Sequence, residues 1–131
     1  MSLERGGMRE MAKTIMIIDD DQVFHDLYAE MLEENDYRFV HAYDGDEALL
    51  KLEEEKPDLF ILDMLMDMMT GDTVLLYLKS MPECAEIPII IISCQPKRGY
   101  KSLKDVDPNL IFLDKTVTKE QLIQEVKAKI G

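Results

Sequence analysis

The chain has 131 residues, which is enough for one compact domain with a single core and too few for a two-domain enzyme. Hydrophobic residues make up 47% and charged residues 32%, a globular balance that excludes a disordered tail and a collagen-like repeat. The 15 Lys and Arg residues stand against 27 Asp and Glu, so the formal net charge is −12. Nucleic acids and anionic membrane surfaces repel such a protein, and we expect neither as a partner.

The sequence predicts no membrane span and no secretion. Its longest apolar run, Ile87–Ile92, is interrupted by Pro88 and is far shorter than the ~20 residues of a membrane-spanning helix. Residues 1–12 lack the apolar core of a signal peptide, and we expect a disordered leader, partly a cloning remnant, before a domain at residues 13–131. Cys84 and Cys94 have no metal-site or disulfide spacing, which favours a cytoplasmic location.

Short apolar runs predict the strands of the domain. Most of them are continuously apolar rather than alternating, which is typical of strands covered on both faces in a parallel sheet. The predicted strands are Thr14–Ile18, Arg38–Ala42, Leu59–Leu62, Ile89–Ile92 and Leu110–Leu113.

Helical patterns follow each of these runs. Apolar residues at helical spacing fall within Phe24–Leu32, Ala48–Leu52, Val74–Leu78 and Leu122–Ile130, and a weaker pattern at Lys97–Val106 predicts a short helix. Thr118 with Gln121 forms a capping-box pattern, and Asp44 with Glu47 a similar helix start. The alternation predicts an α/β fold, a doubly wound (βα)5 domain with helices on both faces of a five-stranded parallel sheet.

Polar residues follow four of the predicted strands. Because the carboxyl ends of parallel strands meet at one edge of the sheet, these side chains should lie together there. They are Asp19, Asp20 and Asp21 after the first strand, Asp63 after the third, Ser93 after the fourth and Lys115 after the fifth.

Clustered carboxylates repel one another and require a compensating cation unless one of them is protonated. Oxygen ligands without His or Cys favour Mg²⁺ over zinc. An aspartate beside Mg²⁺ can attack phosphorus to form an acyl phosphate, whose oxygens Ser93 and Lys115 would then hold. Asp63 is the strongest candidate, because a carboxylate directly after Leu59–Leu62 is costly near a core unless it is coordinated or hydrogen-bonded. Asp21 could instead cap the next helix.

These residues resemble the response-regulator receiver domain of two-component signalling, over nearly the whole chain from Lys13 to Ile130. The segment 15–21 is similar to the family's first strand and acidic pair, and 59–66 to its phosphoacceptor strand. Met66, Met69 and Gly71 also fall at the family's positions in the following loop. The resemblance implies the flavodoxin-like strand order 2-1-3-4-5.

The resemblance also implies roles for single residues. Asp63 would accept a phosphoryl group from a sensor histidine kinase or a phosphotransfer protein. Mg²⁺ would be held by Asp20, Asp63 and the backbone carbonyl of Leu65, with Asp19 acting mainly through water. Ser93 and Phe112 would be the switch pair that alters the surface of the fourth helix, fifth strand and fifth helix.

Two further positions flank the path of the hydrolytic water in the family. They are occupied here by Leu65 and Gln95, and the apolar Leu65 is expected to slow loss of the phosphoryl group, whereas Gln95 could orient a water.

The chain departs from the family pattern in two places. Asp67 and Thr116 stand where the family usually has proline, and without proline we expect a trans peptide at Lys115–Thr116. His25, on the first helix, is expected to be a surface residue, and Cys94 a compact space-filling residue.

Two other functions remain open from the sequence. Asp19-x-Asp21-x-Val23 resembles the nucleophile motif of haloacid-dehalogenase-type phosphatases, but only Glu120 and Glu125 follow the lysine where that family needs a further acidic pair. A pseudo-receiver that binds partners without phosphorylation is the other alternative. The sequence names neither the kinase nor the output, and the receiver could stand alone or belong to a larger protein.

Overall fold

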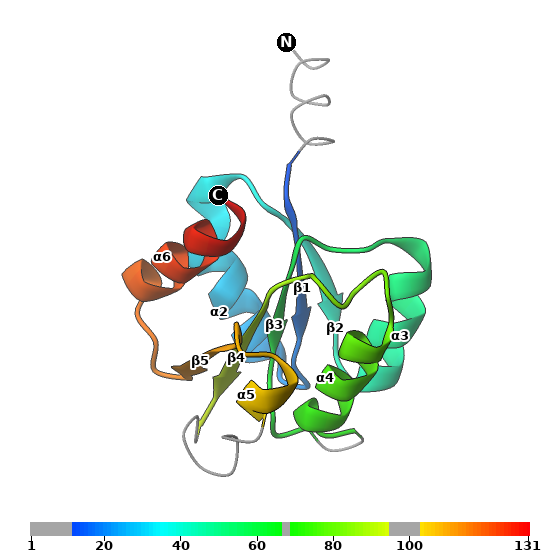
Figure 1. Ribbon diagram of the computed structural model, residues 1–131. Helices are drawn as coiled ribbons and strands as arrows, with labels where there is room; N and C mark the ends of the chain where they lie inside the picture. The colour runs from blue at the N-terminus through cyan, green and yellow to red at the C-terminus, as the bar shows by residue number, and fades with distance from the viewer. Residues whose placement is uncertain (1–11, 67–68, 95–102) are drawn as a thin grey trace.

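A computed structural model describes residues 12–66, 69–94 and 103–131 of the protein (Figure 1). Its sheet has five parallel strands in the order β2-β1-β3-β4-β5, which confirms the predicted fold and strand order. The strands are β1 (Thr14–Ile18), β2 (Arg38–Ala42), β3 (Leu59–Leu62), β4 (Ile89–Ser93) and β5 (Ile111–Asp114).

Helices cover both faces of this sheet. Figure 1 shows α2 and α6 on one side and α3 and α4 on the other. Their bounds are α2 (Gln22–Leu32), α3 (Gly45–Glu54), α4 (Gly71–Ser80), α5 (Leu103–Val106) and α6 (Lys119–Ile130). Among the described residues, no helix is both long and apolar enough to cross a bilayer.

The core has two layers because side chains of a strand point alternately to its two faces. In β1, Met16 and Ile18 pack with α3, α4 and α5, whereas Ile15 and Ile17 pack with α2 and α6. All residues of β1, β3 and β4 are buried, as continuous apolar runs predict. The edge strands β2 and β5 are partly exposed.

The predicted boundaries needed small corrections. β4 includes Ser93, and β5 begins at Ile111 and ends at Asp114, one residue later at each end than predicted. Of the predicted helix Lys97–Val106, only Leu103–Val106 falls within the described residues, where it is helical. Residues 1–11 of the predicted leader lie outside them.

Side-chain caps begin three helices as the sequence indicates. Thr118 and Gln121 form the predicted reciprocal capping box of α6. Asp44 accepts a hydrogen bond from the Glu47 N–H at the start of α3, and Asp21 accepts one from Val23 N–H at the start of α2.

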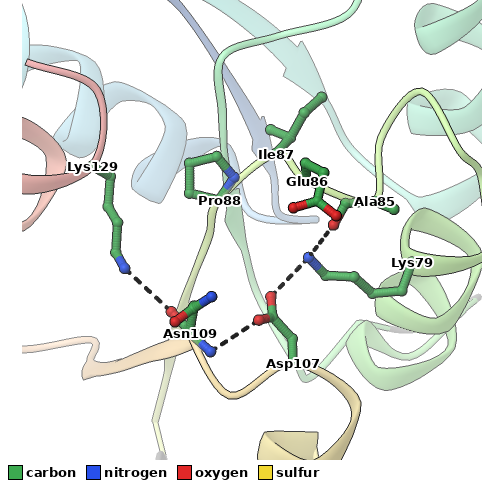
Figure 2. Close-up of a pocket in the computed structure, with 8 residues that line it drawn as sticks. All are labelled: Lys79, Ala85, Glu86, Ile87, Pro88, Asp107, Asn109 and Lys129. Atoms are coloured by element: carbon green, nitrogen blue, oxygen red, sulfur yellow. Dashed lines mark hydrogen bonds and ion pairs between the residues drawn. The ribbon is translucent and has the colours of Figure 1, made fainter.

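A pocket of about 260 Å³ lies at the edge where the strands begin, the amino edge of the sheet (Figure 2). Lys79, from the end of α4, reaches across it to Asp107, with 2.7 Å between Nζ and Oδ2, and also donates to the Ala85 carbonyl. Both side chains are mostly buried. The ion pair therefore ties α4 to the turn before β5.

The charge of Asp107 depends on this pairing. Burial raises the pKa of its carboxyl, but hydrogen bonds from Lys79 and from the Asn109 N–H outweigh burial and lower the pKa below its usual value. The pair therefore stabilises the fold above about pH 4, where an unfolded Asp is ionised, and this contribution is lost as pH falls through the lower folded pKa.

Lys79→Met should lower the free energy of unfolding by about 2 kcal/mol at about pH 7, because the Asp107 carboxylate stays buried without its partner. Urea unfolding at about pH 7 and about pH 3 measures this, and the difference from wild type should shrink at the lower pH as Asp107 is protonated. Lys119→Met, which removes an exposed lysine, should change stability little. An equal loss at both pH values would contradict a charge origin.

Candidate functional site

The predicted site residues lie together at the opposite edge of the sheet, the carboxyl edge, where the strands end. Backbone hydrogen bonds continue beyond the regular strands there. Asp63 N–H donates to the Ile18 carbonyl at 2.9 Å, and Lys115 N–H donates to the Ser93 carbonyl at 3.1 Å. The parallel register of the strands therefore places Asp19, Asp63, Ser93 and Lys115 side by side at the ends of the adjacent strands β1, β3, β4 and β5.

Asp19 is buried, and both its backbone and its side chain have hydrogen-bond partners. Its N–H donates to the Ala42 carbonyl, and its carbonyl accepts from His25 Nε2 at 2.6 Å. Carboxylate Oδ1 accepts from Asp21 N–H at 2.9 Å, and Oδ2 lies 2.6 Å from Lys115 Nζ. A buried carboxylate needs such partners to remain ionised.

Lys115 lies between two aspartates. Its Nζ lies 2.6 Å from Asp19 Oδ2 and 3.7 Å from Asp63 Oδ1. The Phe24 ring, 3.5 Å from Nζ to the ring centroid, covers another side of the ammonium in a cation–π contact. Phe24 was expected only in the apolar stripe of the first helix, and no sequence pattern distinguished this contact from core packing.

Asp63 has fewer compensating contacts than Asp19. Burial, followed by the Asp19 charge, raises the pKa of its carboxyl to about 6, and Lys115 opposes this rise. The Leu65 N–H lies 3.4 Å from Asp63 Oδ1, which is a long hydrogen bond. Asp63 is therefore a buried carboxyl whose ionised form is favoured by added positive charge.

Three carboxylates of the site could hold a metal ion. Asp19, Asp20 and Asp63 each offer an oxygen within 4.8 Å of the others, and Asp20 is exposed to solvent. Within the part of the chain that the structure describes, Lys115 is the lysine paired with these carboxylates, and the three carboxylates outnumber it. Oxygen donors with surplus negative charge suit a hard divalent cation such as Mg²⁺.

The remaining predicted site residues occupy distinct positions around the cluster. Ser93 is fully buried at the end of β4, and Phe112, in β5, is half-buried against the core layer of α3 and α4. Lys104 Nζ lies 5.7 Å from the centroid of the Phe112 ring. Leu65 is 58% exposed beside Asp63, and Gln95 lies outside the described residues.

Gly71 allows the loop after Asp63 to return close to the strand end. Its N–H donates to the Met64 carbonyl at 3.0 Å. A Cβ at this position would lie 2.4 Å from the Asp63 carbonyl oxygen and 2.6 Å from Met64 Cα. Both neighbours are backbone atoms that cannot move aside cheaply, so the position requires glycine.

Two sequence expectations about nearby residues were wrong. His25 is fully buried rather than on the surface, because its ring bonds the Asp19 carbonyl and packs against His41 and Tyr43. Cys94 is exposed and therefore does not fill space in the core. By contrast, the Lys115–Thr116 peptide is trans as expected, and the described residues contain no cis peptide bond.

Known proteins share this architecture and sequence pattern. The response regulator receiver domain family matches residues 15–127. The polar-differentiation response regulator DivK of Brucella anthropi is 25% identical over 121 residues, covering 92% of this chain and 98% of DivK.

Solved structures show the same fold. Chemotaxis protein CheY4 of Vibrio cholerae superposes with a TM-score of 0.82 at 22% identity, covering 91% of this chain and 99% of CheY4. The receiver domain of sensor histidine kinase PA1611 from Pseudomonas aeruginosa has a TM-score of 0.81 at 20% identity, covering 92% and 98% of the two chains. That structure has a magnesium ion coordinated in its active site cleft.

The family match spans most of the chain and includes the ends of all four strands that carry the predicted site residues. The chain therefore belongs to the response-regulator receiver domain family of two-component signalling.

Proposed function

We propose that Asp63 accepts a phosphoryl group from the phosphohistidine of a sensor histidine kinase or of a phosphotransfer protein. The observation that carries this proposal is the buried Asp63 carboxyl at the carboxyl edge, 3.7 Å from the Nζ of Lys115, which also pairs with Asp19. A kinase is the expected donor class, because receiver domains interact with histidine kinases and several structural neighbours are receivers of such kinases.

In this proposal, Asp20, Asp63 and the Leu65 carbonyl hold Mg²⁺, and Asp19 acts mainly through water. The oxygen-only donor set and the excess of carboxylates support Mg²⁺, and the Pseudomonas receiver binds the same ion in its cleft. When bound, the ion offsets negative charge on the phosphoryl oxygens. Lys115, held by Asp19, supplies a second positive charge near Asp63.

The transfer exchanges one phosphorus bond for another. An oxygen of the Asp63 carboxylate attacks phosphorus while the bond from phosphorus to the donor nitrogen breaks, and the electron pair returns to the imidazole of the donor. The product is an acyl phosphate on Asp63, whose oxygens Ser93 and Lys115 hold by hydrogen bonds. The domain would thus assist its own phosphorylation. We propose that it acts as a regulator in the cytoplasm.

The alternatives fit the geometry less well. A haloacid-dehalogenase-type phosphatase would use Asp19 as nucleophile, but Asp19 is buried and both of its carboxylate oxygens are bonded. A phosphorylation-independent pseudo-receiver would have no need for a buried Asp63 with a raised pKa beside a lysine.

Asp63→Asn should abolish phosphorylation, because its amide has nearly the same shape but cannot act as the nucleophile. The protein is incubated with a small phosphodonor and Mg²⁺ and then measured by intact mass. Asp72→Asn, which changes an exposed carboxylate in the first turn of α4, is the matched control and should gain phosphate as wild type does. Equal phosphate incorporation by Asp63→Asn would contradict the assignment.

Phosphorylation should change the surface of α5, β5 and α6, the fourth helix, fifth strand and fifth helix of the sequence prediction. In the proposal, Ser93 moves toward the phosphoryl group and Phe112 turns inward. Hydrogen exchange, measured with and without phosphodonor, should therefore change at β5 as well as near Asp63. In Ser93→Ala, hydrogen exchange should change only near Asp63. If exchange in the wild-type protein also changed only near Asp63 and not at β5, that result would argue against this switch.

Leu65→Asn should accelerate loss of the phosphoryl group several-fold, because an exposed amide beside Asp63 can orient a water that leucine cannot. A time course of phosphate release measures the rate. Affinity for Mg²⁺ should stay nearly unchanged, since only the backbone carbonyl of residue 65 is proposed to meet the metal. Leu50→Asn, an exposed leucine on α3, is the control, and an equal rate in both variants would mean that Leu65 does not restrict water.

A further inference from the structure

His25 is enclosed on several sides although it lies on the helix that follows the site. The ring of Tyr43 lies 4.2 Å from its ring between centroids, and the His41 ring lies 4.9 Å away. The Tyr43 hydroxyl donates to Gln22 Oε1 at 2.7 Å and so closes the gap between β2 and α2 beside His25. His25 is fully buried in this enclosure, which restricts the orientation of its imidazole.

Both nitrogens of His25 are used in this orientation. Nε2 lies 2.6 Å from the Asp19 carbonyl oxygen, and Nδ1 lies 2.7 Å from His41 Nδ1. A carbonyl can only accept, so His25 Nε2 carries a proton and donates it. A hydrogen bond between the two Nδ1 atoms needs one proton, which either histidine can donate. In both cases His25 Nε2 remains a donor to the Asp19 carbonyl.

His41 is itself fixed by its neighbours. Lys51 Nζ donates to the His41 carbonyl, and β2 pairs His41 with Ile17 of β1. Burial lowers the pKa of the His41 imidazole, and electrostatic interactions with His25 and Lys51 lower it further. The neutral form of His41 is therefore favoured. A neutral His41 meets the His25 ring without placing two cations face to face.

We infer that His25 is a positioning residue for the acidic site, holding the Asp19 carbonyl through Nε2 while His41 holds the ring through Nδ1. Among the contacts of Asp19, this one comes from a side chain on α2, and the carboxylate contacts Lys115 and the Asp21 N–H. His25 therefore sets the turn that directs Asp19 toward Lys115 and leaves Asp20 facing the cluster. For the metal, this inference rests on the proposed function.

Amide replacements separate the two bonds of His25. A Gln amide nitrogen is as many bonds from Cβ as His Nε2 and can donate to the Asp19 carbonyl, whereas an Asn nitrogen corresponds to Nδ1 and cannot reach it. His25→Asn should weaken Mg²⁺ binding about tenfold, a size typical of lost outer-shell partners of metal ligands. His25→Gln should restore affinity to within about threefold of wild type by the same reasoning.

A second readout needs no metal. In the metal-free protein, amide exchange at Asp21, whose N–H bonds Asp19 Oδ1, should be faster in His25→Asn than in His25→Gln. Nitrogen NMR of the wild-type imidazole should show the His25 proton on Nε2. Leu32→Ala, a buried change at the far end of the same helix, controls for general loss of stability and should leave Mg²⁺ affinity unchanged.

The outcomes decide between positioning and simple packing. Weak Mg²⁺ binding and fast Asp21 exchange in His25→Asn, with recovery in His25→Gln and none of these effects in Leu32→Ala, support the inference. Unchanged affinity and exchange in His25→Asn, an equal loss in His25→Gln, or an equal loss in Leu32→Ala overturns it. If wild type binds no Mg²⁺, the metal assignment of the proposed function fails, and the exchange measurement alone decides the role of His25.

Discussion

The buried ion pair between Asp19 and Lys115 determines how the other charges of the site are arranged. Lys115 lies closer to Asp19 than to Asp63, at 2.6 Å against 3.7 Å, so most of its compensation goes to one carboxylate. Breaking a buried pair is costly because the remaining charge stays without a partner. Asp19 is thus the fixed, fully bonded carboxylate of the cluster, and Asp63 is left short of positive charge. That shortage is what a divalent cation, and then a phosphoryl group with its cation, would relieve.

The two edges of the sheet carry different kinds of ion pair. At the amino edge, Lys79 and Asp107 satisfy each other and their backbone neighbours, so the pair lowers the pKa of Asp107 and ties two segments together (Figure 2). At the carboxyl edge, Lys115 pairs with both Asp19 and Asp63, and the pKa of Asp63 is raised. Matched charge stabilises the fold at one edge, whereas a buried carboxyl with a raised pKa, such as Asp63 at the other, is the kind of group that functional sites commonly contain. Parallel strands separate the two functions because all their carboxyl ends lie on one side.

The sequence predicted most of the fold because its strands are continuous apolar runs, and a one-residue shift of β5 is the largest strand error. It also predicted that Asp19, Asp20, Asp63 and Lys115 lie close together, since each lies within two residues of the end of a strand. It failed at His25 and Phe24, where the deciding contacts come from residues distant in the chain, His41 and Lys115. A histidine on a helix reads as a surface residue when the partner that buries it lies on another element. Likewise, the position of Phe24 in an apolar stripe does not predict its cation–π contact with Lys115.

A crystal structure of the protein grown with saturating Mg²⁺ would show whether the acidic cluster binds the ion while the Asp19–Lys115 pair stays intact. We expect an ion with oxygen ligands from Asp20, Asp63 and the Leu65 carbonyl, while Lys115 stays paired with Asp19 and His25 keeps its hydrogen bond to the Asp19 carbonyl. An ion bound elsewhere, no ion at the carboxyl edge, or a Lys115 that leaves Asp19 for Asp63 would contradict it.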